Sequence, residues 1–210
     1  MLLIARARLI ATAQNKLDRL RETIESLEEP FARALVYCGD GTIENPDTEE
    51  LTRNIEQVTT MLGTEMNYRV RRFTCEETRE QRDSIINQLK SDQIDAIVAI
   101  RCMDEGIDIP SASLGFILAS STNSRQIIQR RGRLLRKSEE KKFAYIYDFV
   151  VAPPDLAEFV ADERAFNIER KLFKAELRRI IEFCDDAVNG PVALAKLLRL
   201  RKKYNLLADG

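Results

Sequence analysis

The sequence contains no histidine and no tryptophan, and its four cysteines show no paired spacing. Zinc and iron–sulfur sites need closely spaced Cys or His ligands, and imidazole catalysis needs a histidine, so the sequence supports none of these. Isolated cysteines instead indicate small core side chains in a reducing compartment. The four are Cys38, Cys75, Cys102 and Cys184.

Long apolar runs and a strong net charge are also lacking. No segment approaches the roughly 20 apolar residues that a membrane-spanning helix needs, and the run at residues 1–5 is too short for a signal peptide. We therefore expect a cytoplasmic protein with no membrane partner. The net charge is −1 although 32% of the residues are charged. Positive charge is local, because residues 125–142 hold eight Lys or Arg and two Glu, which concentrates positive potential at one edge.

Apolar runs alternate with helical patterns near residues 48–63, 77–90 and 124–136. Parallel strands need crossover connections, and helices supply them, so this alternation predicts an α/β fold with a doubly wound parallel sheet and helices on both faces. Such sheets bind ligands at the carboxyl ends of their strands. The expected strands are 34–38, 68–73, 96–100, 114–119 and 143–150.

Both ends of the chain are expected to be helical extensions. Within residues 1–30, apolar side chains from Ile10 to Leu27 recur at steps of three and four, which predicts an amphipathic helix. It packs on the domain, leads in from a preceding lobe that this sequence lacks, or forms a short coiled coil. The central domain is expected at 31–152. After it, residues 153–210 follow a Pro-Pro pair, and Phe159, Phe166, Phe173 and Ile180 recur every seven residues. This spacing predicts a packing seam on a long helix ending near residue 189, then a second helix over 192–207.

Two segments carry the functional signal: Asp-Glu-Gly-Ile-Asp-Ile-Pro at 104–110 and Gln-Arg-Arg-Gly-Arg-Leu-Leu-Arg at 129–136. If the second is helical, Gln129, Arg133 and Arg136 share the face opposite its apolar stripe. Planar guanidinium groups suit the phosphate oxygens on which charge develops in phosphoryl transfer. A solvated basic helix face is the other interpretation.

In this order the segments resemble motifs V and VI of the superfamily two helicases and translocases. Motif VI matches at Gln129, Gly132, Arg133 and Arg136. Motif V matches through its Gly and Asp, and the resemblance covers roughly residues 30–150. It implies the C-terminal RecA-like lobe of a motor that clamps ATP between two lobes. The motif V spelling is closest to DNA-directed members of repair or restriction type.

The resemblance implies roles for the motif VI residues in ATP hydrolysis. Arg133 and Arg136 would be arginine fingers that reach the terminal phosphate of ATP held mainly by the other lobe, and Gln129 would orient them. Arg131 departs from the family, which more often has an aliphatic residue there. Either the helix breaks near Gly132 or a carboxylate such as Asp148 meets this charge.

The motif V residues would complete the nucleotide site. By resemblance, Gly106 lets the backbone approach the nucleotide, Asp108 accepts a hydrogen bond from the ribose, and Glu105 belongs to the same site. Plain turn geometry is the alternative for Gly106 and Asp108. The pair Asp104–Glu105 does not directly end a hydrophobic strand, so we do not interpret it as a magnesium site.

The resemblance also places nucleic-acid contacts at Gly39, Asp40, Thr74 and Arg82. A plain loop is the alternative for the Gly39–Asp40 turn. At the position where the family often has threonine this chain has an isoleucine, so the following Arg101 is interpreted as a phosphate contact or as half of a salt bridge.

A surface ion pair is the alternative for Arg82, with Glu80 or Asp83 as its partner. No Gly-x-x-x-x-Gly-Lys-Ser/Thr string occurs in the sequence, so the phosphate-binding loop that would hold ATP and Mg²⁺ is expected on an N-terminal RecA-like lobe of the same parent chain. The sequence therefore predicts one lobe of an ATP-dependent helicase, inactive alone, with nucleic acid, preferentially DNA, as partner. A non-catalytic nucleic-acid-binding or regulatory module of the same fold is the alternative.

Overall fold

The computed structural model describes residues 15–39, 42–44, 51–100, 112–119, 143–152, 163–185 and 187–206. The chain divides into two compact units, residues 1–149 and 150–210, and each is described by itself. Within the described residues, no helix is long and apolar enough to cross a membrane.

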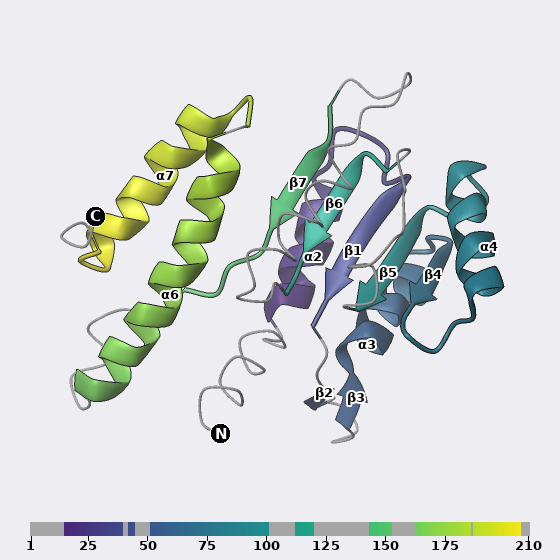
Figure 1. The fold of residues 1–210 in the computed structure, drawn as a ribbon, viewed down its shortest axis with the longest axis horizontal. Helices are drawn as coiled ribbons and strands as arrows, with labels where there is room; N and C mark the ends of the chain where they lie inside the picture. The colour runs from purple at the N-terminus through teal and green to yellow at the C-terminus, as the bar shows by residue number, and fades with distance from the viewer. Residues whose placement is uncertain are drawn as a thin grey trace. The chain divides into compact units, whose positions relative to one another are not determined.

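The first unit is built on a five-stranded sheet in which every neighbouring pair is parallel. Its order is β4-β5-β1-β6-β7 (Figure 1). The prediction of a doubly wound parallel sheet is confirmed. The strands are β1 (Ala34–Cys38), β4 (Val70–Phe73), β5 (Ala96–Ile100), β6 (Leu114–Ile117) and β7 (Tyr145–Asp148).

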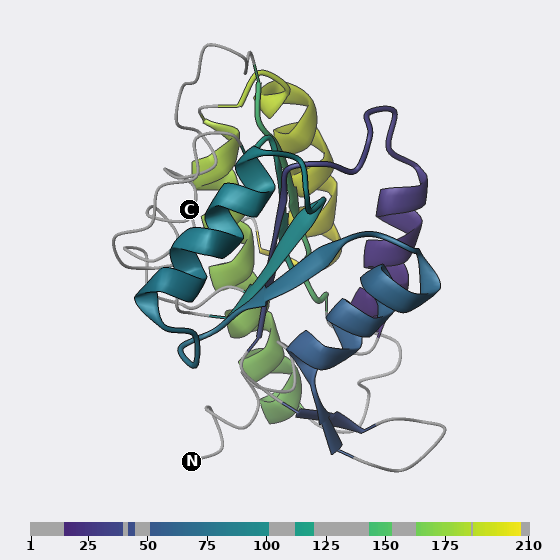
Figure 2. The same ribbon diagram turned by 90° about the vertical axis from the view of Figure 1, so that its right-hand side faces the viewer.

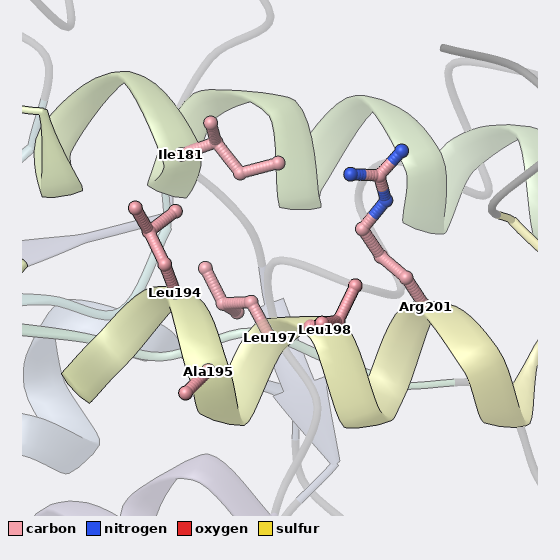
Figure 3. A pocket seen from close by; sticks show the side chains of 6 residues that line it. All are labelled: Ile181, Leu194, Ala195, Leu197, Leu198 and Arg201. Carbon is pink, nitrogen blue, oxygen red and sulfur yellow. The ribbon is translucent and has the colours of Figure 1, made fainter. Parts of the chain in front are cut away.

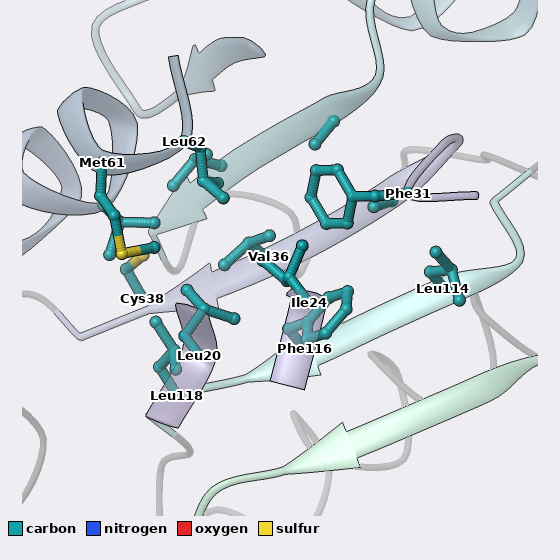
Figure 4. Close-up of a cluster of buried hydrophobic side chains, with 14 of the residues drawn as sticks. Leu20, Ile24, Phe31, Val36, Cys38, Met61, Leu62, Leu114, Phe116 and Leu118 are labelled. Carbon is teal, nitrogen blue, oxygen red and sulfur yellow. The ribbon is translucent and has the colours of Figure 1, made fainter. Parts of the chain in front are cut away.

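The central strand β1 is buried along its whole length, as expected for a parallel strand covered on both faces. Ala34, Val36 and Cys38 face one layer, where they join a cluster with helix α2 (Asn15–Glu25) and helix α3 (Asn54–Thr60) (Figure 4). Helix α4 (Arg79–Lys90) covers the other face (Figure 2).

Helix α2 docks on the sheet through Leu20 and Ile24, which are 0% and 3% exposed. Its apolar stripe therefore belongs to the domain core, which is the docked form of the predicted amphipathic helix. Burial of side chains of this size contributes about 1.5–3 kcal/mol each.

The connection from β1 to α3 differs from the prediction. A helical pattern was expected over residues 48–63, but Leu51–Arg53 forms strand β3, which pairs antiparallel with β2 (Thr42–Glu44). The helix begins only at Asn54, and a π-helical turn, η1 (Met61–Glu65), continues it. Antiparallel pairing with β2 replaced the local helical periodicity of these three residues.

Helix α4 begins where the sequence marks a start. The Thr78 side chain accepts a hydrogen bond from the Gln81 N–H at 3.3 Å, and the Gln81 side chain accepts one from the Thr78 N–H at 2.8 Å. This capping box satisfies two of the amide donors at the helix start. The prediction of a helix over 77–90 is confirmed, with α4 spanning Arg79–Lys90.

The amino ends of the strands are closed by two arginine–aspartate pairs. Arg33, just before β1, donates from Nε and Nη2 to the Asp92 carboxylate at 2.8 and 2.9 Å. Arg69, just before β4, donates from Nη2 to Oδ1 of Asp95 at 2.5 Å and from its backbone N–H to Oδ2 at 2.7 Å. Two-pronged pairs of this kind restrict orientation as well as adding attraction, and they link the segments that lead into β1, β4 and β5.

The second unit contains helices α6 (Glu163–Cys184) and α7 (Gly190–Lys203), which form a hairpin. Phe173 is 2% exposed, and its ring meets that of Tyr204 edge-on, with 4.9 Å between the ring centroids. This contact supports the predicted packing seam at Phe173. Helix α6 ends at Cys184, five residues before the predicted end at 189.

Candidate nucleotide and nucleic-acid site

The carboxyl ends of β5, β1 and β6 lie at one level. Cys38 is the register partner of Ile100, and Tyr37 is the partner of Ile117. The chain leaves β1 toward β4 on one side of the sheet and leaves β6 toward β7 on the other. Neighbouring parallel strands with diverging connections form the crevice in which such sheets bind ligands.

Segments with the functional motifs follow two of these strands along the chain. Residue 101 comes directly after β5, and residue 118 directly after β6. The motif residues themselves lie outside the described part of the structure. The motif VI residues are Gln129, Arg133 and Arg136, and the motif V residues are Glu105, Gly106 and Asp108. Four other residues considered above also lie outside the described part: Asp40, Arg101, Cys102 and Arg131.

Gly39 and Thr74 lie at the carboxyl ends of strands, as the sequence predicted. Gly39 directly follows β1 and is buried. Thr74 directly follows β4 and donates from both its N–H and its hydroxyl to Oε2 of Glu77, at 2.5 and 2.9 Å. Two donors therefore converge on one carboxylate oxygen in the turn that leads into α4.

Arg82 does not form the surface ion pair considered as its alternative role. Its Nη2 donates to the Thr74 carbonyl oxygen at 3.1 Å, and its guanidinium carbon lies 5.6 Å from the centroid of the Phe73 ring. Neither Glu80 nor Asp83 pairs with it, and among the described residues its buried Nε has no hydrogen-bond partner. The structure thus brings Arg82 and Thr74 together at the end of β4 and leaves the arginine charge without a carboxylate in the described fold.

A residue that the sequence reasoning missed lies at the carboxyl end of β6. Lys16, in the first turn of α2, is 7% exposed and donates from Nζ to the carbonyl oxygen of Leu118 at 2.5 Å. Leu118 is the first residue after β6, on the path toward residues 124–136. The available signal was spacing, because Lys16 precedes the buried Leu20 by four residues and so shares its helix face.

The cysteines divide between core and surface. Cys38 and Cys184 are buried, whereas Cys75 is exposed, so the expectation of a core role was wrong for Cys75. Burial raises the pKa of the Cys38 thiol far above its usual range, because desolvation disfavours the thiolate. Cys38 is thus a packing residue rather than a nucleophile.

A surface groove lies in the second unit, between α6 and α7 (Figure 3). It has a volume of about 280 Å³, and Arg201 is its only charged lining residue. The other lining residues are Ile181, Leu194, Ala195, Leu197 and Leu198. An apolar groove with one cation lacks the several polar groups that a nucleotide needs. Among the described residues, no group of three or more Cys, Asp or Glu could hold a metal ion.

Curated relatives of the chain include a DNA translocase and a protein of the UvrABC system. The DNA 3'-5' translocase XPB2 of Sulfurisphaera tokodaii is 24% identical over 135 residues, which are 61% of this chain and 25% of that protein. The UvrABC system protein B of Coxiella burnetii is 30% identical over 137 residues, which are 63% of this chain and 18% of that protein. The chain thus spans a quarter or less of the length of these relatives.

Solved structures with the same fold include the C-terminal parts of two other proteins. The C-terminal domain of the DEAD-box protein Dbp5 has a TM-score of 0.50 and 18% identity, covering 79% of this chain and 80% of that one. The C-terminal part of the Fun30 ATPase domain has a TM-score of 0.50 and 13% identity, covering 75% of this chain and 53% of that one. At these identities the likeness shows the fold alone.

The sequence profile of the helicase conserved C-terminal domain matches residues 15–138, more than half of the chain. The match spans the region from α2 past β6 and includes both motif segments. It agrees with the all-parallel sheet and confirms the resemblance to the C-terminal lobe of superfamily two helicases. The chain therefore belongs to the helicase conserved C-terminal domain family.

Proposed function

We propose that this chain is the second motor lobe of an ATP-dependent nucleic-acid helicase or translocase, and that it completes an ATP site formed mainly by another lobe. The observation that carries the proposal is the strand register: β5 and β6 end level with each other on the two sides of β1. The segments with motifs V and VI follow these two strand ends. Both therefore start at the edge where a parallel sheet binds ligands.

In the proposed site, Arg133 and Arg136 bind the terminal phosphate of ATP and stabilise the charge that develops on it during hydrolysis. Gln129 orients this pair. ATP supplies the free energy for movement, and Mg²⁺ is held by the partner lobe. A guanidinium remains protonated at every working pH, so these contacts do not depend on a titration step.

The ribose side of the site is formed by motif V. Asp108 accepts a hydrogen bond from the ribose, Gly106 allows close backbone approach, and Glu105 lines the same pocket. Opening and closing of the cleft between the two lobes then couples hydrolysis to a changed grip on the strand.

The nucleic-acid track of the proposed lobe runs past the ends of β1 and β4. Gly39, Asp40 and Arg101 contact the backbone there, together with the Thr74–Arg82 pair. The arrangement of Arg82 supports this assignment, because it bonds to a carbonyl and stacks on Phe73 instead of pairing with a described carboxylate. Its charge is therefore available to attract phosphate.

DNA is the proposed substrate. Two observations support it: the motif V spelling Asp-Glu-Gly-Ile-Asp, and relatives whose names are DNA 3'-5' translocase and UvrABC system protein B. Parallel assays with DNA and RNA of one sequence test this choice. Stronger ATPase stimulation by RNA would reverse it.

The proposed function as a whole is tested by comparing the 210-residue chain with the complete parent chain. The complete chain is expected to hydrolyse ATP with stimulation by nucleic acid, and the 210-residue chain is expected to show no turnover, because its sequence has no phosphate-binding loop of the Gly-Lys-Ser/Thr type. Turnover by the 210-residue chain would contradict the shared-site proposal. A complete chain without turnover would favour a non-catalytic binding module.

A further inference from the structure

Helix α7 carries an excess of positive charge that the motor function does not explain. Residues 187–208 contain five Lys or Arg and no Asp or Glu, in a chain whose net charge is −1. Helix α6 mixes its charges, with six Lys or Arg and four Glu between residues 163 and 184. The two helices of one hairpin therefore differ in the composition of their charged side chains.

Most of these cations gather on the face of α7 that is turned away from α6. Leu197 and Tyr204 are 9% and 3% exposed and mark the face that packs against α6. At about 100° per residue, four exposed cations fall on an arc opposite to this face. They are Lys196, Arg199, Lys202 and Lys203, named here the α7 cationic face.

Contacts within the described fold do not account for three of the four cations of this face. Lys196, Arg199 and Lys202 make no ion pair or side-chain hydrogen bond with any residue that the structure describes. Basic residues in the last turn of a helix stabilise its dipole, which explains Lys202 and Lys203. It does not explain Lys196 and Arg199, which precede the last turn.

The spacing of the cations fits a row of phosphates. Lys196 and Lys203 are seven residues apart, which is about 10 Å along a helix axis at 1.5 Å per residue. Phosphates on one strand of a duplex follow each other at about 3.4 Å along its axis, so the face spans roughly three of them.

An anionic membrane fits less well. Surface-binding helices need a continuous apolar face that enters the lipid, and the continuous apolar face of α7 is buried against α6. The exposed apolar side chains are instead dispersed around the cations. They are Val192, Leu198 and Leu200, at 62%, 44% and 37% exposure.

We propose that the α7 cationic face binds the phosphate backbone of nucleic acid, as a second contact of this chain that is separate from the motor track. The choice of nucleic acid as the polyanion rests on the proposed function. The contact is expected to be independent of base sequence, because it uses charge and not base edges.

The test measures binding of a labelled 30-base-pair DNA duplex to the 210-residue chain over a range of KCl concentrations. The variant K196Q/R199Q/K202Q removes three cations from α7. Its matched control, K171Q/K174Q/R178Q, removes three exposed cations with similar helical spacing from α6, where Arg178 lies 3.7 Å from Glu182. Both variants change the net charge equally.

For the α7 variant we expect binding at 0.1 M KCl to weaken roughly 10- to 100-fold and the slope of log K against log [KCl] to fall by about 2–3. The control is expected to lose less than about threefold, because its cations lie on α6, outside the proposed contact, and Arg178 already has Glu182 beside it. Melting curves of both variants check the fold. If the triple variant melts early, Arg199→Gln alone is used, with an expected slope change of about 1.

Equal losses in the two triple variants, or no loss in either, would overturn the proposal, as would a wild-type chain that does not bind the duplex. Binding of phosphatidylserine vesicles or of polyglutamate, but not of DNA, would overturn it in favour of a membrane or an acidic protein. The ATPase test of the proposed function uses turnover of the complete parent chain. The α7 proposal can therefore fail while the motor assignment stands, and the reverse.

Discussion

The two ends of the parallel strands use charged side chains in different ways. At the amino ends, Arg33 and Arg69 are each bound by an aspartate through two-pronged contacts. At the carboxyl ends, Arg82 donates to the Thr74 carbonyl and lies over a ring, with no described carboxylate beside it. The two arginines at the amino ends are thus neutralised by carboxylates, whereas Arg82 at the carboxyl end has no carboxylate partner among the described residues.

This difference implies that stability and function can be separated along the strands. A paired arginine contributes by holding elements together, and its loss leaves a carboxylate without its partner. An arginine held for a phosphate contributes little to folding, so its loss should alter activity and leave the melting temperature almost unchanged. Substitutions at the two ends of the strands test this separation.

The largest expected effect is at motif VI. In the complete parent chain, Arg133→Ala should lower kcat by about 10³ to 10⁵, the range found when an arginine finger is lost. The melting temperature should stay within about 2 °C of wild type. Near-normal ATP turnover in this variant would remove the finger assignment. Arg133→Lys should also be slow, because lysine cannot reproduce the planar donor fork.

A substitution in the hydrophobic core between the two strand ends should lower stability directly. Phe116 in β6 is fully buried, with its ring stacked on that of Tyr147 at 5.0 Å between centroids. Phe116→Ala should reduce the free energy of unfolding by about 3–5 kcal/mol, the usual range for a buried phenylalanine. Urea titration of the 210-residue chain measures this loss. A loss below about 1 kcal/mol would mean that β6 is not part of the domain core.

At the carboxyl end of β4, Arg82→Gln in the complete parent chain should raise the DNA concentration for half-maximal ATPase stimulation about tenfold and reduce the salt slope by about 1. Thr78→Ala, which removes the nearby helix cap, should cost about 1 kcal/mol of stability without changing DNA affinity. If Thr78→Ala weakened DNA binding as much as Arg82→Gln, the role of Arg82 would be structural.

The smallest expected effect is the pH dependence of stability that comes from the Arg69–Asp95 pair at the amino ends of the strands. Burial tends to raise the pKa of Asp95, but hydrogen bonds from the side chain and backbone of Arg69 outweigh it, so the pKa is lowered. A lowered folded pKa gives stability that is present above the unfolded value of about 3.9 and is lost as the pH falls through the folded value.

Between pH 5 and pH 2, wild type should therefore lose more stability than Asp95→Asn, as measured by urea titration at each pH. Identical pH profiles would show that the pair does not contribute. The ATPase of the complete parent chain carrying Asp95→Asn should stay near wild type at pH 7, since Asp95 lies at the amino end of β5 and the proposed site is at the carboxyl ends of the strands.

The strands were predictable because their signals are local. The run Ala34–Cys38 is apolar at every position, which is the mark of a parallel strand covered on both faces, and β1 and β5 have their predicted bounds. Residues 51–53 were predicted as helix and form β3, because their state depends on pairing with residues 42–44 across an intervening segment. Such pairing leaves no periodicity in a single strand of three residues.

The site was predictable in its motifs and less so in its contacts. Motif spacing indicated a helicase lobe, and the family match confirms that level. Sequence patterns could not show that Arg82 turns to the Thr74 carbonyl and Phe73, since Glu80 and Asp83 were nearer along the chain. Sequence patterns also did not identify Lys16, because its hydrogen-bond partner Leu118 is 102 residues away.

By itself, the sequence determined the alternation of elements, the family and the identity of the residues proposed for ATP hydrolysis, because hydrophobic period and short motifs are properties of neighbouring residues. Only the tertiary structure decided the strand order that brings the ends of β5 and β6 to either side of β1, and which cations are neutralised by carboxylates. Those features depend on contacts between residues far apart in the chain, and such contacts are selected by packing of the whole sheet.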